Sequence, residues 1–254
     1  MDVLVSSAGG IATIALDRPA KKNAITAPMY QAMADALRAA DAEGAVRCIV
    51  IHGTSEAFTA GNDLEDFLKH PPQDESAPVF RFMAAIAGCT KPLVAAVAGP
   101  AVGVGTTMLL HCDLVYAGDN ARFALPFSQL ALCPELASSL LLPMLAGHQR
   151  AAEKLMLGEP FGAEEAREMG LVNKVLPAAE TIPHALAQAA KLTRLPASSL
   201  RATKRLMRSG LGAAIAQRMG EENDQFRAML TAPEAREAFT AFLEKRKPDF
   251  SKFG

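Results

Sequence analysis

The sequence lacks the features that would mark several specialised classes of protein. Its four cysteines are scattered without a Cys-x-x-Cys pair, and its five histidines are dispersed without paired ligand spacing. This pattern is typical of reduced thiols in a cytosolic protein, and it argues against a disulfide framework and against a zinc site. The formal net charge is −1, which argues against a dedicated nucleic-acid binder.

Signals for export and for membrane insertion are also missing. The longest apolar stretches, such as Leu93–Ala98 and Leu140–Ala146, are too short or too broken to span a bilayer. No basic segment leads into an apolar run at the start of the sequence, so we expect no signal peptide. The segment Ser251–Gly254 is not a Ser-Lys-Leu peroxisomal address. We therefore expect a cytoplasmic protein with no membrane partner.

The sequence does contain enough apolar residues for a sizeable core. It has 254 residues, of which 50% are hydrophobic, so it could form one large domain or one domain with a helical appendage. Strand-like and helix-like segments alternate as far as Pro196, and beyond it the patterns are helical. We predict an α/β body over residues 1–195 and a helical region over residues 196–254, which packs on the body or on a second subunit.

Local signals predict most elements of the body. Gly9-Gly10 separates two β-rich runs and is typical of a hairpin turn. Thr26 can cap a helix that has Pro28 in its first turn, whereas the proline-rich block Lys69–Pro78 predicts a surface loop. The predicted strands are Val3–Ser7, Ile11–Leu16, Cys48–His52, Leu93–Ala98, Asp113–Ala117, Arg122–Leu125 and Leu171–Leu176. The other predicted helices are Thr106–Cys112, Ser138–Leu145, Gln149–Leu157, Ala163–Met169, Ser198–Arg208, Ala213–Leu230 and Pro233–Arg246.

Two turns rich in small residues are candidates for chemistry. Phe58–Leu64 and Gly99–Gly105 each follow a predicted strand and open a helix. A turn of this kind can direct backbone N–H groups at one developing negative charge. The second turn does not fit a dinucleotide site. The dinucleotide-binding motif Gly-x-Gly-x-x-Gly requires a third glycine where this sequence has Met108. A tight strand-to-helix turn with no chemical role is the alternative for this second turn.

Glu135 is the best candidate for an acid or base. It stands among the small and apolar residues of Ala131–Ala137. It either caps a helix that begins near Ser138, or acts as a partly desolvated general base whose pKa is raised toward neutrality. For Asp63, within the first turn, helix capping is favoured over catalysis. The sequence has no Gly-x-Ser-x-Gly motif, which argues against a serine hydrolase of the α/β type.

Taken together, these segments resemble the enoyl-CoA hydratase/isomerase family, or crotonase superfamily. The resemblance is carried by Leu16–Pro19, Asn23-Ala24, Phe58–Leu64, Lys91-Pro92, Gly99–Gly105, Cys112–Ala117 and Ala241–Pro248. It implies an α/β fold, a crotonase-like spiral of ββα units with a C-terminal helical trimerisation region. It also implies an acyl-CoA thioester substrate from fatty acid metabolism, with coenzyme A as part of the substrate and no separate cofactor. A homotrimer or a dimer of trimers is the implied assembly.

The resemblance also implies roles for individual residues. The backbone N–H groups of Asn62 and Val104 would form an oxyanion hole for the thioester oxygen. The main chain around Ala60, Asp63 and Leu64 would approach the adenine-containing end of coenzyme A, and a basic C-terminal residue would contact phosphate.

The sequence departs from the hydratases of this family at two positions. The positions of their two glutamates are occupied here by Thr107 and Phe127, so hydration is hard to support. Moving a double bond requires only one base, because a single carboxylate can take a proton from C2 and return it to C4. The segment from Pro126 to Glu135 is similar to peroxisomal-type Δ3,Δ2-enoyl-CoA isomerases, with Glu135 at the position of their catalytic glutamate. We therefore predict an enoyl-CoA isomerase. Another reaction of the family, such as hydration or hydrolysis, and a non-catalytic acyl-CoA-binding protein are the alternatives.

Overall fold

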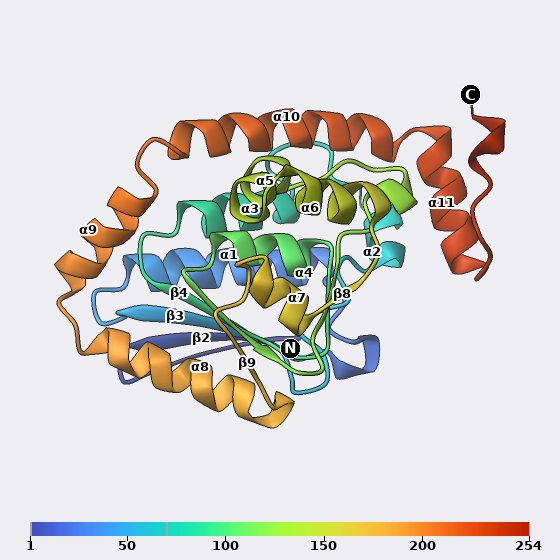
Figure 1. Ribbon diagram of the computed structural model, residues 1–254. Helices are drawn as coiled ribbons and strands as arrows, with labels where there is room; N and C mark the ends of the chain where they lie inside the picture. Colours follow the sequence, from blue (N-terminus) through green and yellow to red (C-terminus); the bar gives the residue numbers. More distant parts are fainter. Residues whose placement is uncertain (1, 70, 254) are drawn as a thin grey trace.

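The computed structural model describes residues 2–69 and 71–253, so Met1, His70 and Gly254 lie outside the described residues. The chain forms a layered α/β structure (Figure 1). Helix α8 covers one face of the main sheet and α1 and α3 cover the other, while α10 lies across the far side of these two helices. The two small-residue turns, Phe58–Leu64 and Gly99–Gly105, lie at one end of these layers.

The strands are β1 (Val3–Ala8), β2 (Ile11–Leu16), β3 (Cys48–His52), β4 (Leu93–Val97), β5 (Pro100–Val102), β6 (Leu114–Gly118), β7 (Arg122–Ala124), β8 (Phe161–Gly162) and β9 (Lys174–Leu176). The α-helices are α1 (Ala27–Ala42), α2 (Leu64–Lys69), α3 (Pro78–Gly88), α4 (Val104–Thr107), α5 (Ser138–Ala146), α6 (His148–Ala152), α7 (Ala163–Glu168), α8 (Ala178–Thr193), α9 (Ala197–Met207), α10 (Gly212–Leu230) and α11 (Pro233–Leu243). Short 3₁₀ or π turns are η1 (Pro19–Lys21), η2 (Met108–His111), η3 (Ser128–Leu130), η4 (Glu153–Leu157) and η5 (Phe250–Lys252).

The main sheet has the strand order β1-β2-β3-β4-β6-β9, and a smaller sheet has the order β5-β7-β8. In the main sheet β1 and β2 are antiparallel and the remaining neighbours are parallel. Ala8 pairs with Ile11, and Gly9 and Gly10 both have positive φ, which confirms the predicted two-residue hairpin turn. Because β3 and β4 are parallel, the segments that follow them leave the sheet at the same end. These segments carry the two small-residue turns.

The core has two parts because the central strands are buried on both faces. Ile49 and Ile51 of β3 belong to the larger cluster, between the sheet and α1 and α3. Cys48 and Val50, which alternate with them, belong to a smaller cluster with α8. Helix α1 turns one apolar face to the larger cluster, and its buried residues at spacings of three and four include Met29, Met33, Leu37 and Ala40.

The structure corrects one predicted capping bond and several predicted boundaries. Thr26 occupies the N-cap position of α1 but makes no side-chain capping bond; the carboxylate of Asp66 accepts the Ala27 N–H at 2.7 Å instead. The helix predicted over Thr106–Cys112 starts at Val104 and continues from Met108 as the 3₁₀ turn η2. The strand predicted over Leu171–Leu176 is limited to β9.

Two helices were not predicted from the sequence. Helix α3 begins with Pro78, which we assigned to the end of a loop, and α8 contains Pro183 and follows Pro177. Proline is tolerated in the first turn of a helix, where Pro78 stands, and tertiary packing outweighs the interior penalty of Pro183 in α8. The predicted loop is confirmed for residues 71–77, which lie between α2 and α3.

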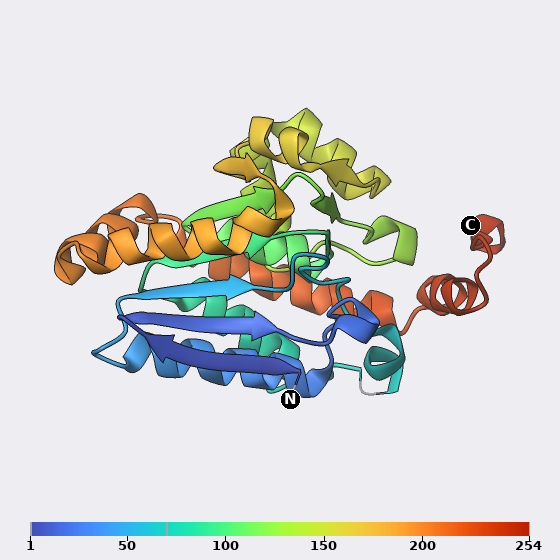
Figure 2. The same ribbon diagram turned by 90° about the horizontal axis from the view of Figure 1, so that it is seen from below.

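The C-terminal part of the described chain is helical. Helix α10 runs along the body, and α11 stands to one side of it (Figures 1 and 2). The proposed division at residues 195 and 196 falls between α8 and α9, and as a domain boundary it stays a prediction. Across the described residues, the helices fall short of the length and apolarity that crossing a bilayer requires.

Candidate active site

The two small-residue turns meet through glycine contacts. Gly61 has a φ of +87°, and a Cβ atom there would lie 2.8 Å from the carbonyl oxygen of Val102. A Cβ atom on Gly105 would lie 2.5 Å from Cγ2 of Thr59. These separations are shorter than a van der Waals contact, so glycine is required at both positions for the turns to approach each other.

This approach brings two free backbone donors to the same cavity. Among the described residues, neither the N–H of Asn62 nor that of Val104 has a hydrogen-bond partner. Their neighbours differ: the N–H of Asp63 donates to the Ile25 carbonyl at 2.9 Å, and that of Gly103 donates to the Ala124 carbonyl at 2.9 Å. Val104 is also the first residue of α4. Two donors left unpaired at one cavity can bind an oxygen that gains negative charge.

The first turn is held by the segment that precedes α1. The Asn23 amide donates to the carbonyl oxygens of Ala57 and Phe58, at 2.8 and 3.1 Å. The Arg18 guanidinium forms an ion pair of 2.7 Å with Asp63. Burial opposes ionisation of Asp63, but Arg18 and the Asp66 N–H outweigh it and hold the pKa of that carboxyl below its usual value. The Asp66 N–H bond confirms that Asp63 caps α2.

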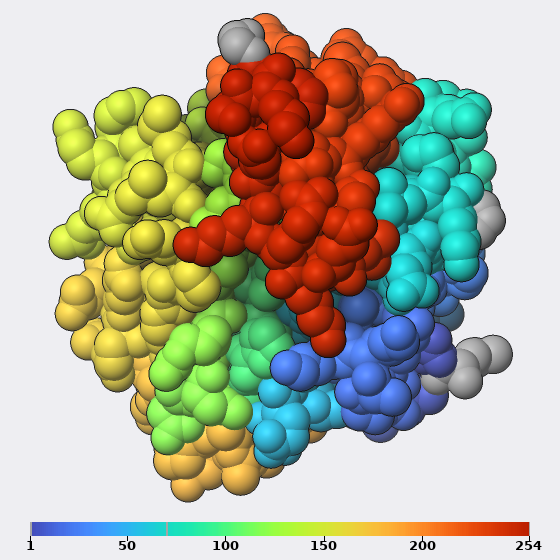
Figure 3. Space-filling view, turned by 90° about the vertical axis from the view of Figure 1, so that its right-hand side faces the viewer, coloured from blue at the N-terminus to red at the C-terminus, as the bar shows by residue number. Residues whose placement is uncertain are grey.

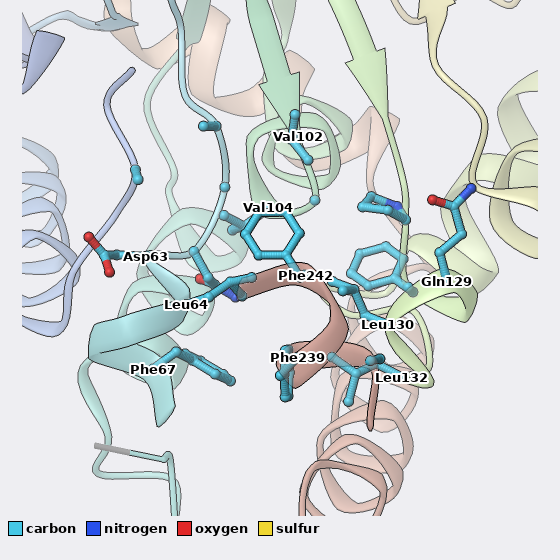
Figure 4. Close-up of a pocket in the computed structure, with 18 of the residues that line it drawn as sticks. Asp63, Leu64, Phe67, Val102, Val104, Gln129, Leu130, Leu132, Phe239 and Phe242 are labelled. Carbon is cyan, nitrogen blue, oxygen red and sulfur yellow. The ribbon is translucent and has the colours of Figure 1, made fainter. Parts of the chain in front are cut away.

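The cavity has a volume of about 770 Å³. Figure 3 shows the C-terminal segment, in red, above the hollow between the blue N-terminal residues and the green middle of the chain. Six predicted site residues line it: Ala60, Asn62, Asp63, Leu64, Val104 and Glu135. Its apolar walls include residues from α2, α11 and the segment before α5 (Figure 4): Leu64, Phe67, Leu130, Leu132, Phe239 and Phe242. Exposed basic residues also line it: Lys21, Arg246 and Lys247.

Glu135 is the buried carboxylate of this cavity, with 4% of its surface exposed. The Thr107 hydroxyl donates to its Oε1 at 2.5 Å, whereas its Oε2 is buried without a hydrogen-bond partner in the described part of the chain. Burial raises the pKa of Glu135 to about 8; the Thr107 hydrogen bond acts in the opposite direction, and the negative charge of Glu222 adds to the increase. A carboxyl group in this environment can take up and release a proton near neutral pH.

The alternative role of Glu135 as a side-chain cap is wrong. Its backbone carbonyl accepts the Ser138 N–H at 3.0 Å, but its carboxylate contacts Thr107. The start of α5 is capped by Glu222, which accepts the N–H groups of Ala137 and Ser139. The cap therefore comes from a helix distant in the sequence.

Some polar residues near the site were not found from the sequence. The Tyr30 hydroxyl donates to the side-chain oxygen of Asn62, and Asn223 lines the cavity with a buried Oδ1 that has no partner among the described residues. No short motif marks Tyr30, Asn223 or Glu222, because each reaches the site through tertiary packing. Within residues 2–69 and 71–253, histidine, cysteine and acidic side chains form no group of three or more that could hold a metal ion.

Comparison with known proteins defines the class first. The fold is that of the crotonase superfamily: the structure of an enoyl-CoA hydratase/isomerase from Pseudoalteromonas atlantica T6c superposes with a TM-score of 0.94 and 37% identity, covering 99% of this chain and 100% of that one. The family model for enoyl-CoA hydratase/isomerase matches residues 6–252. The chain therefore belongs to the enoyl-CoA hydratase/isomerase family, a family of enzymes that act on acyl-CoA thioesters.

Curated relatives in this family have different named reactions. Enoyl-CoA delta isomerase 2 of Rattus norvegicus is 37% identical over 252 residues, which cover 97% of this chain and 64% of the rat protein. The 2,3-dehydroadipyl-CoA hydratase of Escherichia coli strain K12 is 31% identical over 252 residues, which cover 98% of each chain. The chain thus spans less than two thirds of the rat isomerase, and the choice of reaction depends on the site.

Proposed function

We propose that this protein moves the double bond of a 3-enoyl-CoA to the 2-position, using Glu135 as a single base. The observation that carries the proposal is the unpaired Oε2 of Glu135 in the cavity that the Asn62 and Val104 N–H groups also line. Two other carboxylates line this cavity, but Asp63 is paired with Arg18 and Glu65 is exposed. Glu135 is therefore the carboxylate available to a buried substrate carbon.

The proposed reaction consists of two proton transfers. Oε2 of Glu135 takes a proton from C2, and the electron pair of that C–H bond delocalises into the thioester, which becomes a dienolate. The N–H groups of Asn62 and Val104 stabilise the negative charge on the thioester oxygen. Glu135 then returns the proton to C4, the double bond forms between C2 and C3, and the carboxylate is regenerated. The reaction requires no external acid, base or cofactor.

The rest of the cavity suits an acyl-CoA thioester. Its apolar walls, from α2, α11 and the segment before α5, suit an acyl chain, and Pro72 contributes from the loop after α2. The main chain of Ala60, Asp63 and Leu64 would contact the adenine-containing end of coenzyme A. Basic residues that line the cavity, such as Lys21 and Arg246, would contact phosphate. Coenzyme A enters as part of the substrate, and we propose no separate cofactor.

We also propose that the protein is a homotrimer or a dimer of trimers. The support is a set of large apolar side chains that are 56% to 71% exposed in the single chain: Met144, Met156, Leu206, Met207 and Phe242. Light scattering coupled to size-exclusion chromatography tests this assembly, and a monomer at micromolar concentration would contradict it. The cytoplasmic location stays a prediction.

The test of the reaction is an assay of 3-enoyl-, 2-enoyl- and dienoyl-CoA thioesters with the wild type and Glu135→Gln. We expect the wild type to convert 3-enoyl-CoA to 2-enoyl-CoA, and Glu135→Gln to bind the thioester without turnover. Glu65→Gln, which changes the exposed carboxylate of the same cavity, is the matched control. Formation of 3-hydroxyacyl-CoA would favour hydration instead, and binding without turnover of any isomer would favour a non-catalytic protein. Normal turnover by Glu135→Gln would overturn the proposal.

A further inference from the structure

The backbone turn that follows Glu135 is strained. Leu136 and Ala137 have φ angles of +58° and +55°, in the left-handed region that residues other than glycine rarely adopt. Two such residues in succession persist only where surrounding contacts hold them. Because this turn joins Glu135 to α5, the contacts that hold it also set the direction of the Glu135 side chain.

One of these contacts comes from His111, at the end of η2. Its Nε2 lies 2.9 Å from the carbonyl oxygen of Leu136. Burial lowers the pKa of His111 to about 4, so the ring is neutral near pH 7. Since the carbonyl oxygen is an acceptor, the contacting nitrogen carries the ring proton and donates it. This bond holds the acceptor side of the strained turn.

The donor side of the turn is held by Glu222 on α10. Its Oε2 accepts the Ala137 N–H at 2.6 Å, and its Oε1 accepts the N–H and the hydroxyl of Ser139 at 3.0 and 2.5 Å. Glu222 is 6% exposed. Ala137 occupies the N-cap position of α5 and has no side-chain acceptor, so the carboxylate of Glu222 supplies the missing cap.

We propose that Glu222 is a positioning residue: from α10 it fixes the turn of Leu136 and Ala137, and thereby the direction in which the Glu135 carboxylate points. This inference rests on the proposed function, in which Glu135 is the base. Glu222 lies outside the lining of the cavity, so it acts through the turn and does not touch the substrate.

The charge of Glu222 adds a second, electrostatic effect. Burial is the main cause of the raised pKa of Glu135, and the negative charge of Glu222 raises this pKa further. The titratable groups near the pair are Tyr30 of α1 and Cys133, whose pKa values burial raises, and the guanidinium of Arg218 on α10. Tyr30 and Cys133 are thus neutral near pH 7. Removal of the charge at Glu222 should lower the pKa of Glu135.

The experiment compares Glu222→Gln and Glu222→Ala with Glu221→Gln. Glu221 is the preceding residue of α10; its side chain is 53% exposed and contacts Gln217 and Arg218. We expect Glu222→Ala to lower kcat by about 10- to 100-fold, because a displaced base loses its reactive geometry. KM, and the affinity for a saturated acyl-CoA, should change little. Glu222→Gln should move the rising limb of the pH profile of kcat/KM to lower pH, and Glu221→Gln should leave both properties unchanged.

A readout that needs no turnover separates this inference from the proposed reaction. In protein with ¹³C-labelled glutamate carboxyls, the Glu135 signal is assigned by its loss in Glu135→Gln. Glu222→Gln should lower the pH midpoint of that signal, even if no thioester is turned over. Circular dichroism checks that the isosteric variant stays folded. A wild-type kcat in Glu222→Ala would overturn the positioning role, and an unchanged midpoint in Glu222→Gln would overturn the electrostatic effect.

Discussion

The hydroxyl of Thr107 donates a hydrogen bond of 2.5 Å to Oε1 of Glu135, and both residues are buried. The resemblance to the family implies that a hydratase would carry a glutamate at the position of Thr107. Thr107 bonds one oxygen of the Glu135 carboxylate, and the other oxygen has no partner among the described residues. The Thr107 hydroxyl thus helps to orient the Glu135 carboxylate.

Thr107→Val should raise the pKa of Glu135. The Thr107 hydrogen bond favours the ionised carboxylate, so its loss leaves the burial effect less opposed. We expect the rising limb of kcat/KM, which reports deprotonation of Glu135 near pH 8, to move to higher pH. Thr107→Ser retains the hydroxyl and should keep the wild-type profile. A lower midpoint in Thr107→Val would contradict this account.

Glu135→Gln should stabilise the protein more at high pH than at low pH. The pKa of Glu135 is about 8 in the fold against an ordinary value of 4.5. The folded state therefore holds this proton more tightly, and the associated stability is present below pH 4.5 and lost as pH rises through 8. Glutamine does not titrate, so the Tm of the variant relative to wild type should increase between pH 5 and pH 8. Thermal unfolding measures this difference, and a constant difference would disprove it.

Gly105→Ala should impair catalysis through the backbone. The added methyl group would lie 2.5 Å from Cγ2 of Thr59 and push apart the two turns that carry the N–H donors. Loss of one oxyanion donor typically lowers kcat by about 10²–10³-fold, and steady-state kinetics should show a loss of that order. The control is Gly220→Ala on α10, where a Cβ atom meets nothing within 4 Å. It should retain wild-type kcat; a similar loss in both variants would point to a general folding defect.

Isotope labelling should show that one carboxylate carries both proton transfers. With 3-enoyl-CoA deuterated at C2, we expect part of the label at C4 of the product. Glu135 is only 4% exposed, so its proton exchanges slowly with water while the dienolate persists. Mass spectrometry or NMR of the product measures the transfer, with unlabelled substrate in D₂O as the complementary control. Complete loss of label to solvent would indicate an exposed base or two separate groups.

The sequence predicted the parts of the site that depend on local backbone geometry. Gly61 and Gly103 mark the turns because their positive φ angles are encoded by the glycines themselves. Glu135 was recognisable because a carboxylate in an apolar run needs a special explanation. These signals lie within a few residues of the groups they position.

The contacts that complete the site could not be predicted in this way. Tyr30 contacts Asn62 from α1, and Glu222 contacts Ala137 across 85 residues of sequence. Such pairs depend on how helices pack, and nothing in the local sequence of Glu222 distinguishes it from the exposed Glu221. The same limit applied to α3 and α8, which are held by packing on α1 and on the main sheet, respectively.

The contact between Glu222 and the turn at Ala137 has a consequence for protein synthesis. A ribosome makes the two glycine turns and the base well before it makes α10. A nascent chain that ends ahead of α10 therefore lacks the carboxylate of Glu222 that caps the turn after Glu135. Because α11 and the residues after it also line the cavity, the pocket and the cap on the turn would both be completed only when nearly the whole chain has emerged.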